Sequence, residues 1–161
     1  MAQFLRPDED ISVGGGSASE KWSSAPLYEK VDEETYSDAD YISSSTYGRR
    51  KCILGLTSGE EPASHTGHIV RVRAKYTSRR CEWMQVTLYQ GSTEIEMKQF
   101  TLSSSFQTFS FEVSEAKAGN ITDYTDLRIG ILDDEYQMAV SWVELEIPDA
   151  GATGLEMGCN F

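Results

Sequence analysis

The sequence contains few cysteines, and their positions exclude several kinds of site. Only 3 of the 161 residues are cysteine, at Cys52, Cys81 and Cys159. Three thiols cannot all pair within one chain, and no two of them stand in the C-x-x-C spacing that is typical of zinc or redox sites. We therefore expect reduced thiols.

Basic residues and long apolar runs are also scarce. The chain has 14 Lys and Arg against 26 Asp and Glu, which gives a formal net charge of -12. Binding to nucleic acid or to an anionic membrane surface requires clustered cations. No apolar run reaches about 18 residues, and the N-terminus lacks the charged and apolar regions of a signal peptide. We expect a soluble protein made in a cytoplasm, with no nucleic-acid partner and no membrane partner.

Residue patterns that carry catalytic or metal chemistry are missing as well. His65 and His68 have no third ligand nearby in the sequence, and no nucleophile elbow or phosphate-binding loop occurs. The carboxylates within residues 32–40 lack the alternating ligands and central glycine of a calcium loop, so they favour a solvated acidic turn. We predict no catalytic residue, no cofactor and no metal. The alternatives are a pair of catalytic carboxylates and a calcium ion at the turn 133–135.

Alternation of apolar and polar residues dominates the rest of the chain. This period of two is the signature of strands buried on one face, and such strands need a second layer to enclose a core. The chain is long enough for one domain. We predict an all-β sandwich of about eight antiparallel strands over residues 1–150, followed by a flexible tail over residues 151–161. The expected strands are 51–57, 67–77, 83–90, 94–102, 106–113 and two runs within 121–150.

Residues 121–150 are interpreted as a central hairpin around which the other strands are placed. Apolar residues recur at every second position on both sides of the acidic turn 133–135. Pro148 ends the second strand because it cannot donate to a ladder. Trp142 breaks the parity and falls on the same side as Glu144, so it is either exposed or follows a β-bulge.

Parity also assigns other side chains to the interior. Phe109 and Phe111 share one side of their strand and are expected in the middle of the core. Ile95 and Met97 are expected to point inward from the return arm of a hairpin. Two short stretches depart from the alternation and predict single helical turns. These turns are expected within residues 25–31 and 114–119.

The charge is distributed unevenly along the chain. Residues 46–100 carry 9 basic and 5 acidic side chains, whereas the segments before and after them are strongly acidic. Arg71, Arg73 and Lys75 alternate with apolar residues, so they share one face of a strand. One interpretation of the charge is that it keeps the chain soluble. The other is that the basic strand faces an acidic neighbour, either within the fold or on a partner. We expect it to pair with acidic strands across the sheet.

The two ends of the chain hold apolar residues without a periodic pattern. Residues 1–24 form either an edge strand or an arm that becomes ordered on a partner. Phe4 and Leu5 in this segment, Trp22 after the glycine-rich loop, and Phe161 at the other end are the candidate partner contacts. The alternative is that Phe4 and Leu5 cap the core of their own domain.

Several motifs resemble a family of small structural proteins of tailed bacteriophages. The opening motifs are Leu5-Arg6-Pro7, Asp10-Ile11-Ser12, Leu27-Tyr28-Glu29, Val31-Asp32-Glu33 and Asp38-Ala39-Asp40-Tyr41-Ile42. The closing motifs occupy residues 121–128 and 140–148. The likeness covers almost the whole chain up to Ala150. One departure is that this chain places its tryptophan at Trp22 and not directly after the glycines.

The resemblance implies a jelly-roll sandwich and a role in the virion. The expected function is a capsid decoration protein that binds the major capsid protein on the outer surface of the shell and bridges neighbouring capsomers. The protein is then expected to form a homo-oligomer, with a trimer favoured. It is expected to be made in the host cytoplasm and not to be an enzyme. The alternative is a tail-associated carbohydrate-binding module for host recognition, and a glycan-cleaving enzyme is the third class. A row of exposed aromatic residues would distinguish the carbohydrate-binding alternative, with Trp83, Tyr89 and Trp142 as candidates.

Overall fold

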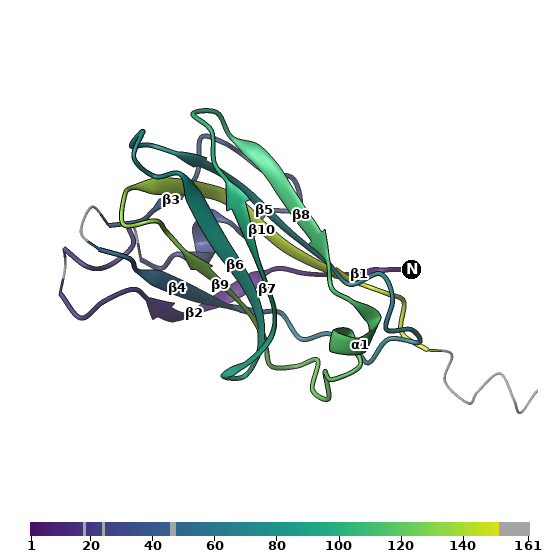
Figure 1. Ribbon diagram of the computed structural model, residues 1–161. Helices are drawn as coiled ribbons and strands as arrows, with labels where there is room; N and C mark the ends of the chain where they lie inside the picture. Colours follow the sequence, from purple (N-terminus) through teal and green to yellow (C-terminus); the bar gives the residue numbers. More distant parts are fainter. Residues whose placement is uncertain (18, 24, 46–47, 152–161) are drawn as a thin grey trace, which may run out of the picture.

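A computed structural model of the chain describes residues 1–17, 19–23, 25–45 and 48–151. The described chain is a jelly-roll β-sandwich of two antiparallel five-stranded sheets, which confirms the predicted fold class (Figure 1). Ten strands are present among the described residues instead of about eight. One additional strand is β1 (Gln3–Leu5), which is too short to give a periodic signal. The short strand β3 (Ile42–Ser43) lies where the apolar pair Tyr41 and Ile42 predicts a strand after the first helical turn.

Each sheet is defined by its strand order. Sheet A has the order β1, β10 (Met138–Ile147), β5 (Ile69–Tyr76) and β8 (Gln107–Glu112), and β3 also pairs with β10. Sheet B has the order β2 (Pro7–Val13), β4 (Lys51–Leu56), β9 (Leu127–Leu132), β6 (Trp83–Gln90) and β7 (Thr93–Thr101). The N-terminal segment therefore contributes an edge strand to each sheet.

The central hairpin predicted within residues 121–150 is wrong. Both predicted strands exist, but β9 pairs with β4 and β6 in sheet B, whereas β10 pairs with β1, β3 and β5 in sheet A. Periodicity reports that a strand is buried on one face and contains no information on its partner. A connection of residues 133–137 is long enough to cross the roughly 10 Å between packed sheets.

The core lies between the inner faces of the two sheets. Phe111 is buried as predicted, but Phe109 is only partly buried. Both rings pack against Phe100 of β7, with centroid distances of 5.3 Å for Phe109 and 6.2 Å for Phe111. Because β7 and β8 are edge strands, these rings close one open side of the sandwich and Phe109 keeps contact with solvent. The strand residues that fill the centre include Leu54, Val72, Leu88, Ile129 and Val143.

A β-bulge in β7 explains one wrong assignment. The register shifts between Leu88 and Tyr89 of β6, which pair with Glu96 and Glu94, so Ile95 is the additional residue. Ile95 is buried as predicted, but beyond the bulge the parity is reversed. Glu96 is therefore buried and Met97 is exposed.

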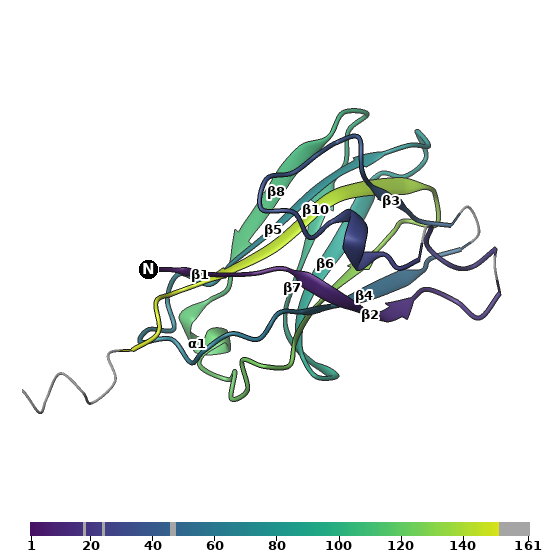
Figure 2. The same cartoon turned by 180° about the vertical axis from the view of Figure 1, so that it is seen from behind.

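The two predicted helical turns are confirmed. The 3-10 helix η1 (Tyr28–Lys30) lies beside β2 (Figure 2). There Asp10 accepts hydrogen bonds from the backbone N–H groups of Leu27 (2.7 Å) and Tyr28 (2.9 Å). The helix α1 (Glu115–Ala118) begins after Ser114, whose side chain accepts from the N–H of Lys117. In the described part of the chain, neither helix is long or apolar enough to cross a membrane.

Candidate functional site

Three of the four candidate partner contacts lie in the described chain, and two of them are buried within it. Leu5 is 2% exposed and belongs to the core. Trp22 is also 2% exposed, and its Nε1 donates to the carbonyl oxygen of Arg50 at 3.0 Å. Phe4 points the other way from Leu5 and is 47% exposed. Phe161 lies outside the described residues. Only Phe4 thus offers an apolar surface to a partner among the three described residues.

The buried titratable groups of the described chain form no cluster larger than a pair. His68 is buried, and its Nε2 lies 2.9 Å from the hydroxyl of Tyr124. Burial lowers the pKa of His68 and raises the pKa of Tyr124 to about 12. Cys52 and Cys81 are free and buried, and burial raises the pKa of Cys81 to about 11. Within residues 1–17, 19–23, 25–45 and 48–151, no pocket forms and no three potential metal ligands gather.

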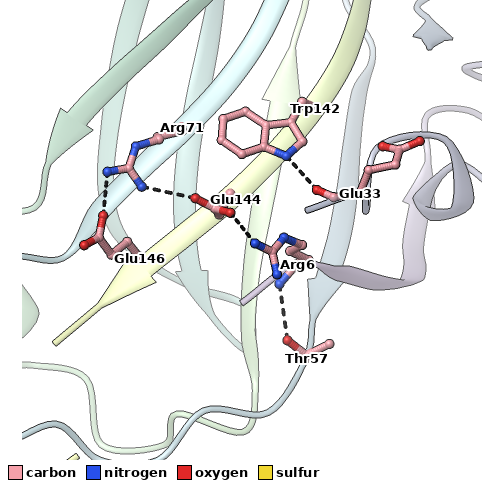
Figure 3. A network of polar contacts seen from close by, with 7 residues as sticks. All are labelled: Arg6, Glu33, Thr57, Arg71, Trp142, Glu144 and Glu146. Atoms are coloured by element: carbon pink, nitrogen blue, oxygen red, sulfur yellow. Dashed lines mark hydrogen bonds and ion pairs between the residues drawn. The ribbon is translucent and has the colours of Figure 1, made fainter. Parts of the chain in front are cut away.

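The outer face of sheet A carries an ion-pair network that confirms the predicted pairing across the sheet for Arg71 alone of the three basic residues of β5 (Figure 3). Arg71 of β5 bonds to Glu144 at 3.1 Å and to Glu146, both on the neighbouring strand β10. Arg6, which follows β1, bonds to the second carboxylate oxygen of Glu144 at 2.8 Å. Cations and carboxylates thus neutralise one another across three adjacent segments of the chain.

Trp142 lies beside this network and is not available to a ligand. The register of β10 shifts between Val140 and Trp142, which confirms the bulge alternative. The indole is 8% exposed, and its Nε1 donates to the carbonyl oxygen of Glu33 at 2.8 Å (Figure 3). Tyr36 covers it, with a centroid distance of 6.1 Å. The loop that contains Glu33 and Tyr36 therefore removes Trp142 from the row of exposed aromatic residues.

The other two aromatic candidates share one face of the molecule. Trp83 and Tyr89 stand at even spacing on β6, and both are partly exposed. Met84, Val86 and Leu88, which alternate with them, are buried in the core, so the two rings lie on the outer face of sheet B. Six residues of strand separate them by about 20 Å. We name the surface formed by Trp83, Gln85, Tyr89, Met97 and Gln99 the β6 platform.

Tyr89 is fixed in a defined orientation across the sheet. A Cβ atom added to Gly130 of β9 would lie 2.8 Å from Cε2 of Tyr89, so the ring rests against the backbone of that glycine. The Nζ of Lys51 on β4 donates to the Tyr89 hydroxyl at 2.6 Å. The ring therefore extends from β6 over β9 to β4, and Tyr89 stays partly exposed to solvent.

The rest of the β6 platform combines a second ring with amide groups. The guanidinium of Arg49 lies 4.9 Å from the ring centroid of Trp83. Between the two rings, Gln85 Nε2 donates to Gln99 Oε1 at 3.3 Å, and Met97 is 39% exposed. The surface has the composition of a binding face: aromatic rings at both ends and amides that both donate and accept between them.

The sequence identified only part of this surface. The sequence names Trp83 and Tyr89 as candidate exposed aromatic residues, but it assigns no role on this surface to Lys51, Gln99 or Gly130. Gly130 did carry a signal, because a glycine inside an apolar strand often marks the close approach of another group. The sequence around Gly130 does not identify the approaching group, because the Tyr89 ring belongs to a strand about 40 residues earlier in the chain.

Comparisons with known proteins find likeness at the level of the fold. No protein-family model and no curated protein matches the chain. Similar solved structures include the C-terminal CBM6 of LamC, a laminarinase from Zobellia galactanivorans, at 11% identity and TM-score 0.49, covering 91% of this chain and 100% of that one. CBM29_1 of Piromyces equi has 14% identity and TM-score 0.47, covering 98% of both chains. The Stig cyclase Fisc of Fischerella sp. TAU has 13% identity and TM-score 0.47, covering 93% and 77%. Likeness this distant carries no argument about what this chain binds.

Proposed function

We propose that the chain is a carbohydrate-binding module that holds a sugar polymer on the β6 platform. The observation that carries this proposal is the placement of Trp83 and Tyr89 on one sheet face, with the amides of Gln85 and Gln99 between them. Partly exposed aromatic rings on one sheet face are the feature that favours carbohydrate binding over capsid decoration.

The chemistry of the platform suits a chain of sugar rings. The C–H faces of sugars are apolar and pack on aromatic rings, whereas their hydroxyl groups need partners that both donate and accept, as Gln side chains do. A span of about 20 Å between the rings favours an oligosaccharide over a single sugar. Tyr89 is already held by Lys51 and Gly130, so binding would cost little side-chain entropy.

Replacing Tyr89 by alanine is expected to weaken binding about tenfold, because the ring supplies one of the two stacking surfaces. Affinity electrophoresis against a panel of soluble polysaccharides would identify a ligand, and isothermal titration would measure its affinity. Gly130→Ala should weaken binding in the same way while retaining the ring, because its Cβ would displace Tyr89.

Tyr36→Ala is the matched control, since this exposed tyrosine lies over sheet A. Its affinity for the polysaccharide should equal that of the unchanged protein. Equal loss in Tyr36→Ala and Tyr89→Ala would contradict the location of the site. Failure of the whole panel to bind would contradict the proposed function.

A second candidate, favoured by Phe4, is decoration of a tailed-phage shell through contact with the major capsid protein. Phe4 is 47% exposed on the short edge strand β1, where a partner can reach both its ring and the open edge of sheet A. We expect Phe4→Asp to reduce attachment to shells about tenfold or more, because a charge replaces an apolar anchor.

Cosedimentation with shells that lack the chain, followed by electron microscopy, would measure this attachment. Met97→Asp is the control, since it places the same charge at an exposed apolar residue of sheet B. Attachment that is unaffected by Phe4→Asp would exclude Phe4 as the anchor. Absence of any attachment would exclude the decoration role.

A further inference from the structure

Five basic residues form no ion pair with the described residues, and three of them lie close together in the sequence. The chain has nearly twice as many acidic as basic residues, so most cations find a partner. Lys75 ends the basic face of β5, and Arg79 and Arg80 follow in the next turn. That turn is closed by a hydrogen bond from Cys81 N to the carbonyl oxygen of Ser78 at 2.9 Å. The five unpaired cations are Lys21, Lys51, Lys75, Arg79 and Arg80.

Two of these three cations, Lys75 and Arg80, each contact an aromatic ring from another part of the chain. Lys75 Nζ lies 4.8 Å from the ring centroid of Phe106, and Arg80 lies 5.7 Å from that of Tyr136. Tyr41 packs against Phe106 at a centroid distance of 6.1 Å and is itself 45% exposed. Contact with a ring restrains each cation while leaving its charge at the surface.

The neighbouring loop is held in place by Asp38. Its two carboxylate oxygens each accept a hydrogen bond from Arg73 at 2.7 Å, and Oδ1 also accepts from Ser141 at 2.8 Å. The Arg73 guanidinium holds the pKa of Asp38 below its usual value. The charge of Lys75 also acts on Asp38. Both Asp38 oxygens, however, already accept hydrogen bonds from Arg73 or Ser141. The guanidinium lies 4.0 Å from the centroid of Tyr36, which is 45% exposed.

We infer that this surface binds an acidic segment of a partner polypeptide. We name it the basic aromatic patch and define it by Tyr36, Tyr41, Lys75, Arg79, Arg80 and Phe106. Tyrosine and arginine are the residues that most often supply the binding energy of protein interfaces. The partner must be acidic where it touches the patch, because three cations there have no carboxylate partner in the described part of the chain.

The surroundings of the patch favour a short acidic segment over a long polyanion. Glu34 precedes Tyr36 in the loop that Asp38 holds in place. Glu82 follows the turn that contains Arg79 and Arg80. Both glutamates are exposed. A uniformly charged polysaccharide would extend from the patch onto these acidic residues and be repelled. A polypeptide can place its acidic residues on the patch and neutral residues beyond it.

Fluorescence anisotropy with a labelled oligoglutamate peptide tests the inference on the full chain. The unchanged protein should bind the peptide, and affinity should fall when the salt concentration is raised to about 0.3 M, since surface charges are then screened. The double variant Lys75→Glu with Arg80→Glu should bind at least about tenfold more weakly. Tyr41→Ala should also weaken binding, whereas Tyr41→Phe should retain most of it, because the ring supplies the contact area.

Lys21→Glu is the matched control, because Lys21 is exposed and unpaired but lies outside the patch. It should bind the peptide as tightly as the unchanged protein. Equal weakening by Lys21→Glu would show that only the net charge matters and would overturn the inference. Binding of dextran sulfate at the patch without binding of oligoglutamate would overturn it in favour of an anionic polysaccharide. The melting temperatures of all variants show that each one is folded.

Discussion

Replacing Trp22 by alanine is expected to lower the free energy of unfolding by about 3 to 5 kcal/mol, the range observed for large aromatic side chains in protein cores. The indole is 2% exposed and belongs to the core cluster. Its loss also leaves the carbonyl oxygen of Arg50 without its donor. Equilibrium denaturation in urea, followed by fluorescence or circular dichroism, would measure the change.

Phe4→Ala is the control for Trp22→Ala, since both residues were candidate partner contacts. Phe4 is 47% exposed, so its removal should change the free energy of unfolding by only about 0.5 kcal/mol. If Trp22→Ala left stability unchanged, Trp22 would not be a core residue. Its role as a partner contact would then regain support.

Replacing Glu144 by alanine is expected to cost about 3 kcal/mol, because the change breaks a largely buried ion network. The Glu144 side chain is 5% exposed and accepts hydrogen bonds from Arg6 and Arg71 (Figure 3). Without it, two guanidinium groups keep their charge in a partly desolvated place. Arg6 is affected most, because its Nε is already buried without a hydrogen-bond partner among the described residues.

Glu146→Ala removes a carboxylate from the same face of the same strand and is the matched comparison for Glu144→Ala. Among the residues that the structure describes, Glu146 pairs with Arg71 alone, and its side chain is 23% exposed. The expected cost is about 1 kcal/mol or less, as for other solvent-accessible ion pairs. Equal costs in thermal and urea denaturation would contradict the assignment of Glu144 as the centre of the network.

The face that each side chain occupies was largely readable from the sequence, and the exceptions have local causes. Period-two alternation assigns Phe111 and Ile95 to the interior, and the structure agrees. It failed at Met97, because the bulge at Ile95 reverses the parity of β7. At Trp142 the break in parity left exposure and a bulge as alternatives, and the structure has the bulge. A bulge arises from the pairing of two strands. The sequence of one strand therefore indicates a bulge only where a side chain clearly departs from the alternation of apolar and polar residues.

The sequence was less informative about which aromatic residues meet the basic strand. Arg73 and Lys75 were seen as a basic face with few aromatic residues interleaved. The rings that surround them, Tyr36 and Phe106, come from segments more than 30 residues away in the chain. Contacts of this kind depend on loops folding back over a sheet, and loop paths leave no periodic signal.

The sequence by itself determined the fold class, the two helical turns and the one-sided burial of most strands. These features follow from local rules: alternation with a period of two, a capping serine and the chain-breaking effect of proline and glycine. Tertiary structure alone decided that β9 and β10 belong to different sheets and that Leu5 and Trp22 lie in the core. It also decided that Tyr89 rests on Gly130. The physical reason is that pairing and packing are set by the free energy of the whole sandwich, in which each buried face must meet another, and no short stretch of sequence contains its partner.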